Sequence, residues 1–347
     1  MGRRSKAAAK RKMKKKLISF ALAILILIVG AVVYMLTNKE DTPDDSGNKT
    51  YDIPTGSVEF HFIDIGQGDA ELILVDGKAI LIDTGVSAQK ENLSKYLADH
   101  NVTELEYFVA THPDADHIGS AAYVVENYTI KNVIISPKVH TTKTYENFIS
   151  AIEAKPDINL YVAGDPNSKD DDGLEVNLPI DSKFNVGELE FTVLGPVDQG
   201  DYSKNDNNNP SVVLMARWGN TKVLLTGDAE KEAELKLVEK YGMDLNCDVL
   251  KTGHHGSHSS TFQADPENGI MYGFLHYTTP SMAIISCETG NDYGHPHAET
   301  IDYLTSENVE ILRTDELGSI VLVSDGNTIT KKAQEQTKRT SNEVRFL

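Results

Sequence analysis

The chain has 347 residues, enough for one large domain or two ordinary ones. It carries 52 acidic and 33 basic residues, but nine of the basic residues and no acidic residue lie within the first 36 positions. The rest of the chain therefore holds 52 acids against 24 bases, a net charge of −28 that repels polyanions and argues against a broad nucleic-acid-binding surface. Two cysteines, Cys247 and Cys287, exclude a disulfide scaffold; each lies in or beside an apolar run and is predicted to be a small core residue.

The N-terminal region predicts a membrane anchor. Residues 1–16 are basic, and residues 17–36 form an uncharged apolar run long enough to cross a bilayer as a helix. This order predicts a single-pass protein of the cell membrane, with a cytoplasmic N-terminus and an extracellular catalytic domain. A cleaved signal peptide is the alternative, but no small-x-small site and no lipobox cysteine follow the run, which favours an uncleaved signal anchor. Residues 37–56 predict a flexible linker.

Residues 57–325 alternate short strand-like runs with helical patterns, and residues 326–347 predict a C-terminal tail. The first three strands, at 58–63, 71–75 and 79–82, form a meander, and Asp76-Gly77 is the hairpin turn between the last two. Helices are expected at 88–100, 118–128, 145–154, 229–241 and 298–306. This pattern predicts an α/β fold of two mixed sheets covered by outer helices.

Residues 111–117, Thr-His-Pro-Asp-Ala-Asp-His, are the most distinctive stretch. An apolar run precedes them and a helical pattern follows, which predicts a loop between a strand and a helix. His112, Asp114 and Asp116 alternate, so an extended loop would direct them around one point, and His117 can reach a second point beside it. Imidazole and carboxylate donors suit Zn²⁺, Mn²⁺ or Fe²⁺. The alternative is a helix N-cap, but one Asp would be enough for that, so the motif favours a metal site.

Other polar residues also follow predicted strands, where the loops of layered α/β folds build their sites. Asp228 follows the strand at 222–226; it is either a helix cap or, in company with residues 111–117, a carboxylate that bridges two metal ions. His254 and His255 are paired in a glycine loop without an evident packing purpose, so one of them is predicted to be a metal ligand. The other is predicted to face substrate oxygens together with Lys251, Ser257, His258 and Ser259.

His295 lies in a Gly-His-Pro turn after the strand at 283–286. It is either an ordinary turn residue or a catalytic residue that gives a proton or a hydrogen bond to a leaving oxygen. Lys251 and His258 are predicted to assist the same leaving group.

These motifs resemble the metallo-β-lactamase superfamily, and within it the branch that contains the extracellular C-terminal domain of the ComEC/Rec2 competence proteins, which act in DNA uptake. The resemblance implies an αββα sandwich and a hydrolase with two divalent metal ions, Zn²⁺ or Mn²⁺. The stretches that carry it appear in family order at 62–69, 81–85, 111–119, 208–211, 225–228, 250–257 and 293–296.

The resemblance also implies roles for single residues. Asp116 would orient the attacking water, and Asp64 and Asp83 would lie behind the ligands, where Asp83 steadies the histidines. The implied ligands are His112 and Asp114 for the first metal, Asp116 and His117 for the second, Asp228 as the bridge, and His254 or His255 to complete the second site.

The sequence departs from the usual superfamily pattern in two places. Asp114 replaces a histidine, as in the ComEC-like branch, and its harder oxygen makes Mn²⁺ plausible beside Zn²⁺. The superfamily also usually has a histidine before Asp228, where residues 207–211 read Asn-Asn-Asn-Pro-Ser. Asn209 or water is expected to complete the first site, and Asn209 is also a candidate for substrate binding. An insertion at 265–273 is expected to reshape the substrate cleft.

The resulting prediction is a membrane-anchored extracellular phosphodiesterase or nuclease in which metal-activated water attacks phosphorus. Its substrate would be DNA or, given the negative charge of the domain, a smaller ester such as a cell-wall phosphorylcholine or teichoic-acid ester. Asp114 and the missing histidine disfavour a β-lactam or lactone hydrolase. A non-catalytic, metal-stabilised surface binding module is the other alternative, and the sequence names no protein partner.

Overall fold

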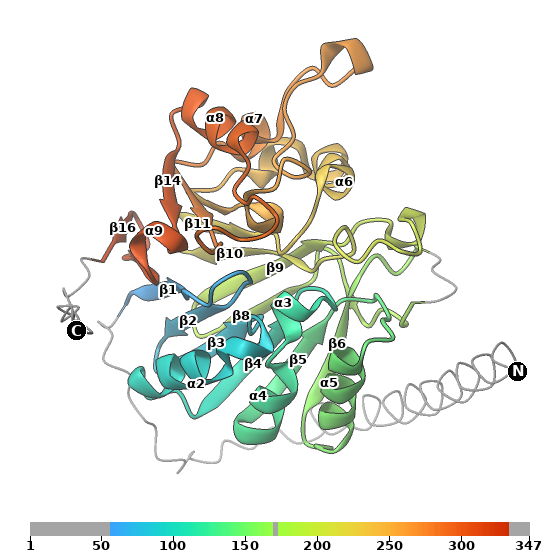
Figure 1. The fold of residues 1–347 in the computed structure, drawn as a ribbon, viewed down its shortest axis with the longest axis vertical. Helices are drawn as coiled ribbons and strands as arrows, with labels where there is room; N and C mark the ends of the chain where they lie inside the picture. The colour runs from blue at the N-terminus through green and yellow to red at the C-terminus, as the bar shows by residue number, and fades with distance from the viewer. Residues whose placement is uncertain (1–55, 169–172, 333–347) are drawn as a thin grey trace, which may run out of the picture. The chain divides into compact units, whose positions relative to one another are not determined.

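The computed structural model describes residues 56–168 and 173–332 (Figure 1). In these ranges, no helix combines the length and the apolar character that a membrane span needs. The anchor predicted at 17–36 lies outside the described residues, as do the basic segment 1–16 and nearly all of the linker predicted at 37–56.

Two mixed sheets form the described domain, as predicted. The first sheet has nine strands; β1 to β3 pair antiparallel as the expected meander, and β3 to β7 pair parallel. Its strand order is β16 (Ile329–Lys331), β15 (Ile320–Ser324), β1 (Val58–Phe62), β2 (Glu71–Val75), β3 (Lys78–Ile82), β4 (Glu104–Ala110), β5 (Thr129–Ile135), β6 (Asn159–Gly164) and β7 (Leu178–Pro179).

The second sheet has seven strands, of which β8 to β11 pair antiparallel and β11 to β14 pair parallel. Its strand order is β14 (Glu310–Arg313), β13 (Met282–Ile285), β12 (Val249–Lys251), β11 (Thr221–Leu225), β10 (Val213–Trp218), β9 (Leu189–Gly195) and β8 (Lys183–Val186).

Helices cover the outer face of each sheet, and Figure 1 shows the two groups on opposite sides. Apolar side chains fill the space between the sheets and the space between each sheet and its helices. Strands such as β3 are buried on both faces, which explains their nearly continuous apolar sequence. The helices are α2 (Lys90–Asp99), α4 (Ala121–Asn127) and α5 (Lys143–Glu153) on the first sheet, and α6 (Lys231–Tyr241), α7 (Phe274–Thr278) and α8 (Ala298–Ser306) on the second.

The helix predicted at 118–128 is divided into α3 (Ala115–Ile118) and α4. A Cβ on Gly119 would collide with backbone atoms of Ser87 and Ala115, so only glycine lets α3 approach the loop after β3 this closely. The Thr84 hydroxyl accepts a hydrogen bond from the backbone N–H of Ser120 at 3.2 Å. These contacts bring the loop at 111–117 beside the end of β3.

Two further predictions concern the edges of the domain. The prediction of a tail from residue 326 is wrong for residues 329–331, which form β16 and pair with β15. The next residue, Lys332, forms an ion pair with Glu59, with Nζ 2.7 Å from Oε1. The insertion at 265–273 projects from the second half of the domain at the top of Figure 1, away from the strand ends that carry the motifs. The remaining short elements are α9 (Thr314–Leu317), η1 (Ser87–Gln89), η2 (Gln199–Asp201), η3 (Gly242–Leu245), η4 (Gly253–Gly256) and η5 (Pro266–Asn268).

Both cysteines are free and buried, as predicted: Cys247 lies between β12 and the helices outside it, and Cys287 follows β13 in the same core.

Candidate metal centre

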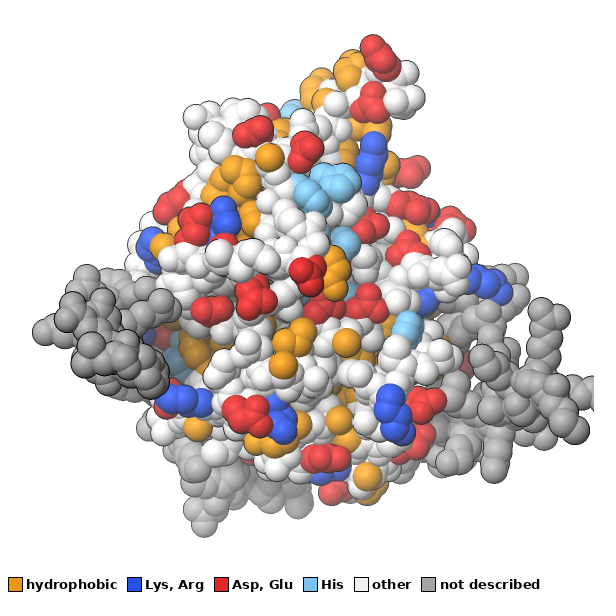
Figure 2. All heavy atoms as spheres, viewed as in Figure 1, with side chains coloured by type: hydrophobic (Ala, Val, Ile, Leu, Met, Phe, Trp, Pro, Cys, Tyr) orange, Lys and Arg blue, Asp and Glu red, His pale blue; other side chains and the backbone are white. Residues whose placement is uncertain are grey.

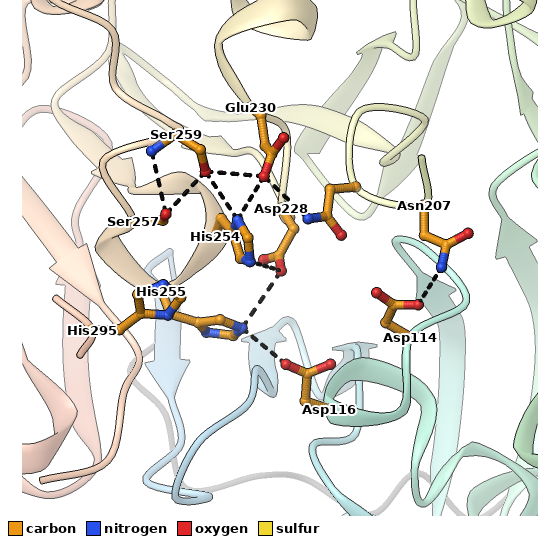
Figure 3. Close-up of polar contacts among 12 residues, drawn as sticks. Asp114, Asp116, Asn207, Asp228, Glu230, His254, His255, Ser257, Ser259 and His295 are labelled. Carbon is orange, nitrogen blue, oxygen red and sulfur yellow. Dashed lines mark hydrogen bonds and ion pairs between the residues drawn. The ribbon is translucent and has the colours of Figure 1, made fainter. Parts of the chain in front are cut away.

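The loops that follow β3, β4, β11 and β12 meet at one place between the two halves of the domain (Figure 3). Figure 2 shows histidine side chains gathered on the corresponding face, with acidic side chains around them. The strand ends that the sequence analysis singled out therefore build one site.

Asp228 lies at the centre of this site. Its carboxylate oxygens lie 3.2 Å from His117 Nε2, 3.5 Å from His255 Nε2 and 3.7 Å from His112 Nε2. The side chain is buried, and the Asp228 backbone N–H donates to the Ser211 hydroxyl at 3.2 Å. Three imidazole nitrogens that converge on one carboxylate form the arrangement expected around a bound metal ion.

Asp83 and Thr111 fix the orientation of His117 from behind. Asp83 Oδ2 accepts a hydrogen bond from His117 Nδ1 at 2.7 Å. Thr111 donates its backbone N–H and its hydroxyl to the same carboxylate, at 2.8 and 2.6 Å. Because Nδ1 of His117 donates to a carboxylate, Nε2 is the nitrogen left for a metal ion, which would replace its proton. Asp83 thus lies where the sequence analysis places it.

His255, rather than His254, belongs to the buried cluster. Both residues have left-handed backbones, with φ of +55° and +47°, a conformation that costs about 1–2 kcal/mol per non-glycine residue. His255 Nδ1 donates to the Ser286 carbonyl at 3.0 Å, which leaves Nε2 free, 3.3 Å from Asp116 Oδ2. His254 lies at the edge, with Nδ1 2.9 Å from Glu230 Oε1 and Nε2 3.9 Å from Asp228.

Several buried polar atoms of the cluster fit a metal ion. Nε2 of His112, His117 and His255 makes no hydrogen bond within the described chain, and the same holds for Oδ1 of Asp69 and Asp228. Such buried atoms are costly unless something satisfies them. A divalent cation would do so, and the nitrogen and oxygen donors suit Zn²⁺ or Mn²⁺. Four residues each bring one ligand atom within 4.8 Å of the others: Asp69, His117, Asp228 and His255.

The charges of the cluster depend on one another. Burial lowers the pKa of His117, but the Asp228 and Asp83 carboxylates outweigh burial and hold this pKa well above its usual value. Burial raises the pKa of Asp228, but His117 and His255 outweigh it and hold this pKa well below its usual range. Burial and the neighbouring His117 lower the pKa of His112 to about 3, so this imidazole is neutral and offers a lone pair at neutral pH.

The prediction that Lys251 faces the substrate is wrong. Its side chain is fully buried, and Nζ lies 2.6 Å from Asp69 Oδ2 and donates to the Thr252 carbonyl at 3.2 Å. An ammonium group enclosed in this way cannot reach a leaving group. Lys251 instead neutralises Asp69, which is one of the four residues of the metal cluster.

Asp69 is the site residue that the sequence analysis missed. The sequence indicated this residue, because Asp69 ends the glycine loop at 66–69. This loop is part of the stretch 62–69, one of those that carry the resemblance to the superfamily. Asp64 is predicted from that stretch instead, but the structure places Asp64 at the surface, where its Oδ1 accepts a hydrogen bond from the Gly66 backbone at 3.4 Å. Asp64 therefore does not lie behind the ligands.

The ligands predicted for the first metal do not all lie together. Asp114 lies apart from the group of four, and its Oδ1 accepts a hydrogen bond from Asn207 Nδ2 at 2.8 Å (Figure 3). The prediction for Asn209 is wrong, because its side-chain oxygen accepts the backbone N–H groups of Glu230 and Ala233, both at 3.1 Å. Asn209 thus satisfies free donors at the start of α6 rather than a metal or a substrate.

The serines of the His254 loop form a hydrogen-bonded network around that histidine. Ser259 Oγ donates to Glu230 Oε1 at 2.9 Å and lies 3.2 Å from His254 Nδ1, and Ser257 Oγ lies 2.9 Å from Ser259 Oγ. These hydroxyls, predicted to face substrate oxygens, instead position His254. His258 is exposed, and its backbone N–H donates to His297 Nδ1 at 3.1 Å.

His295 and His254 differ in their readiness to give a proton. Burial and the neighbouring His254 and His255 lower the pKa of His295 to about 4, so His295 is neutral at neutral pH and can give a hydrogen bond but not act as an acid. Burial also lowers the pKa of His254, but the hydrogen bond to Glu230 and the charge of Asp228 outweigh it and raise this pKa above its usual value. His254 is therefore the better proton donor.

Residues 63–268, more than half of the chain, match the Metallo-beta-lactamase superfamily. The chain belongs to this superfamily, and its two mixed sheets and its outer helices have the corresponding fold. The resemblance found in the sequence is thereby confirmed.

The relatives of this chain include competence proteins. ComE operon protein 3 of Bacillus subtilis (strain 168) is 31% identical over 281 residues, 76% of this chain and 32% of that protein. Competence protein ComA of Neisseria gonorrhoeae is 26% identical over 269 residues, 77% of this chain and 32% of that protein. The chain thus spans about a third of the length of these relatives. Among solved structures, the metallo-beta-lactamase fold protein YhfI from Bacillus subtilis has 12% identity and a TM-score of 0.45, and the match covers 77% of this chain and 100% of that one.

Proposed function

We propose that this protein is a metal-dependent phosphodiesterase. The observation that carries the proposal is the set of buried imidazole nitrogens of His112, His117 and His255, which converge on Asp228 without hydrogen-bond partners in the described chain. When bound at such donors, a pair of divalent ions supplies an activated water and neutralises charge on a phosphoryl oxygen.

In this proposal, Asp116 orients the attacking water. Its side chain is 30% exposed, so it borders both the cluster and the solvent, and Oδ2 lies 3.3 Å from His255 Nε2. Burial raises the pKa of Asp116, but the adjacent His255 imidazole and the charge of His117 outweigh it, so this pKa lies below its usual value. The carboxylate is therefore ionised and would accept a hydrogen bond from the attacking water.

His254 is placed to give a proton to the leaving oxygen. Glu230 and Ser259 hold its Nδ1, and the side chain is 26% exposed, so that Nε2 borders both the metal cluster and the solvent. His295, whose ring centroid lies 5.2 Å from that of His254, adds a neutral hydrogen-bond donor beside it.

The class of substrate is also a proposal. The names of the relatives point to competence, in favour of DNA or a nucleotide. The net charge of −28 beyond residue 36 favours a short ester over a long polyanion. A cell-wall phosphate ester is the competing substrate of that size.

The first test measures hydrolysis of bis-p-nitrophenyl phosphate by the full-length protein with Mn²⁺ and with Zn²⁺. We expect metal-dependent turnover that Asp228→Asn reduces at least 100-fold, because this change removes the charge on which the imidazoles converge. Asp64→Asn, which neutralises an exposed acid, is the matched control and should retain activity. A folded, metal-loaded protein without turnover on any phosphodiester would overturn the proposal and leave a surface binding module.

We also propose that residues 17–36 anchor the protein in the cell membrane, with the described domain outside. The support is the apolar run with nine basic residues before it. Deletion of residues 1–36 should move the protein from the membrane fraction, after an alkaline wash, to the soluble fraction. Recovery of the intact full-length protein in the soluble fraction would contradict the anchor.

A further inference from the structure

Tyr293 is a large aromatic side chain whose ring stacks on His295 and is not part of the hydrophobic core. It is 66% exposed, although its backbone is held in place. Asn291 Oδ1 accepts the backbone N–H groups of Tyr293 and His295, at 3.1 and 3.0 Å. The loop before α8 thus presents this ring to the solvent from an ordered position. The other large hydrophobic side chains exposed in the described ranges are Met243, Met271 and Tyr272.

Two successive ring contacts connect the buried His255 to the exposed Tyr293. The rings of His255 and His295 are 6.0 Å apart between centroids, with an angle of 28° between their planes. The rings of His295 and Tyr293 are 5.7 Å apart, with an angle of 22°. These distances and angles are those of offset aromatic stacks. A flat group attached to a phosphate at the metal cluster would extend past His295 and stack on the face of Tyr293 that His295 leaves open.

The charge of the protein favours stacking over phosphate contacts. The chain beyond residue 36 has 52 acids and 24 bases, and Lys251, the lysine next to the histidine loop, is buried against Asp69. A surface of this kind gives a nucleic-acid backbone little electrostatic attraction. Affinity for a nucleotide would then come from the metal ions and from base stacking, which is independent of charge.

We propose that Tyr293 is a stacking platform for the nucleobase of a short nucleotide phosphodiester whose phosphate lies at the metal centre. This inference rests on the proposed phosphodiesterase function and adds the substrate class to it. Stacking of one base on an aromatic side chain changes affinity by about 5- to 100-fold. A polyol phosphate of the teichoic-acid kind has no flat π face and would gain no comparable stabilisation.

The test compares two substrates of the full-length, Mn²⁺-loaded protein: the dinucleotide thymidylyl-thymidine and its analogue without both bases. The variants are Tyr293→Leu, which keeps an apolar side chain without a π face, and Tyr293→Phe, which keeps the ring. Tyr272→Leu is the matched control, because Tyr272 is also exposed but lies in the projecting insertion, where it stacks on His276.

We expect wild type to have a KM about tenfold lower for the dinucleotide than for the analogue without bases. This ratio should fall to about one in Tyr293→Leu and stay near the wild-type ratio in Tyr293→Phe and Tyr272→Leu. An unchanged ratio in Tyr293→Leu would overturn the platform, even if the phosphodiesterase activity itself is established.

Binding of the dinucleotide, measured by equilibrium dialysis in an Asp116→Ala background, separates the two proposals. If wild type cleaves neither compound but dinucleotide binding still depends on Tyr293, the phosphodiesterase proposal fails and the platform stands. Dinucleotide binding that is equal with Tyr293 and with Leu at this position would overturn the platform.

Discussion

The orientation of His254 depends on a single carboxylate at the start of α6. Glu230 Oε1 accepts hydrogen bonds from His254 Nδ1, from the Ser259 hydroxyl and from Asn208 Nδ2. The same carboxylate raises the pKa of His254 after burial has lowered it. If His254 protonates the leaving oxygen, Glu230 sets both its direction and its protonation.

Glu230→Gln should impair cleavage most where the leaving group needs a proton. We expect turnover of thymidylyl-thymidine to fall on the order of tenfold, and turnover of bis-p-nitrophenyl phosphate to change much less, because p-nitrophenolate leaves without protonation. Without the carboxylate the pKa of His254 falls, so the imidazolium is lost at lower pH. The alkaline limb of the kcat/KM profile for the dinucleotide should therefore shift to lower pH.

Glu232→Gln, which changes an exposed acid of the same helix, is the control and should leave the profile in place. Equal losses on both substrates after Glu230→Gln would show that His254 is not the proton donor.

The buried pair of Lys251 and Asp69 contributes to stability rather than to leaving-group protonation. Lys251→Met would leave Asp69 without its cation in a site that excludes water. We expect this change to lower the free energy of unfolding of the metal-free protein by about 3–5 kcal/mol. The double variant Lys251→Met with Asp69→Asn should recover part of that loss, because neither charge is then left alone. Urea denaturation measures both values, and a double variant less stable than Lys251→Met would contradict the pairing.

The sequence predicted the chemistry of single residues better than their environments. Histidine and aspartate residues at the ends of predicted strands identified His112, His117 and Asp228 as candidate ligands from the sequence alone. The pairing of Lys251 could not be predicted in this way, because its partner is 182 positions away and a lysine beside two histidines is equally compatible with catalysis. The choice between His254 and His255 depends on two left-handed backbones, which no sequence pattern revealed.

At the scale of the element, α6 connects the metal centre to the loop after the histidine pair. Glu234, one turn beyond Glu230, is fully buried and accepts the backbone N–H groups of Thr261 and Phe262, at 2.7 and 3.0 Å. Burial raises the pKa of Glu234 from 4.5 to about 8, despite these two donors. The folded protein therefore holds a proton on Glu234 at a pH where the unfolded chain has lost it.

This difference predicts a pH-dependent stability. Because the pKa of Glu234 is higher in the folded state, its contribution is fully present below about pH 4.5 and is lost as the pH rises toward 8. The loss amounts to at most about 5 kcal/mol. Glu234→Gln cannot titrate, so its unfolding free energy should vary less between pH 5 and 8, as measured by urea denaturation at each pH. Glu239→Gln, at an exposed position of α6, should keep the wild-type slope; a wild-type slope in Glu234→Gln would contradict the raised pKa.

Elements with a strong pattern were predicted, and short or interrupted elements were not. The helices α2, α5, α6 and α8 lie within a few residues of their predicted ranges, because each has an apolar face of helical period. The edge strand β8 alternates polar and apolar residues, but its four residues are too few to distinguish a strand from a loop by pattern. The break between α3 and α4 depends on a close approach of two backbones, which a local pattern cannot report.

At the scale of the whole domain, the metal centre joins the two sheets. Asp69 and His117 come from loops of the first sheet, whereas Asp228 and His255 follow strands of the second sheet. Without metal, ion pairs link the two sheets directly, among them His117 with Asp228, His255 with Asp116 and Lys251 with Asp69. A bound ion would link the cluster residues more strongly, and it would bind the folded state alone because the unfolded chain does not assemble these donors.

Metal binding should therefore raise the melting temperature with the logarithm of the free metal concentration. At 100 times Kd, the linkage amounts to about 2.7 kcal/mol of unfolding free energy, and a chelator should remove it. Calorimetry of the full-length protein in increasing Mn²⁺ and Zn²⁺ measures the effect. Asp228→Asn should abolish the dependence, because this residue contacts three of the cluster histidines, whereas His258→Asn, at an exposed histidine outside the cluster, should keep it. If the melting temperature of the wild type does not respond to either ion, the cluster is a network of ion pairs and not a metal site.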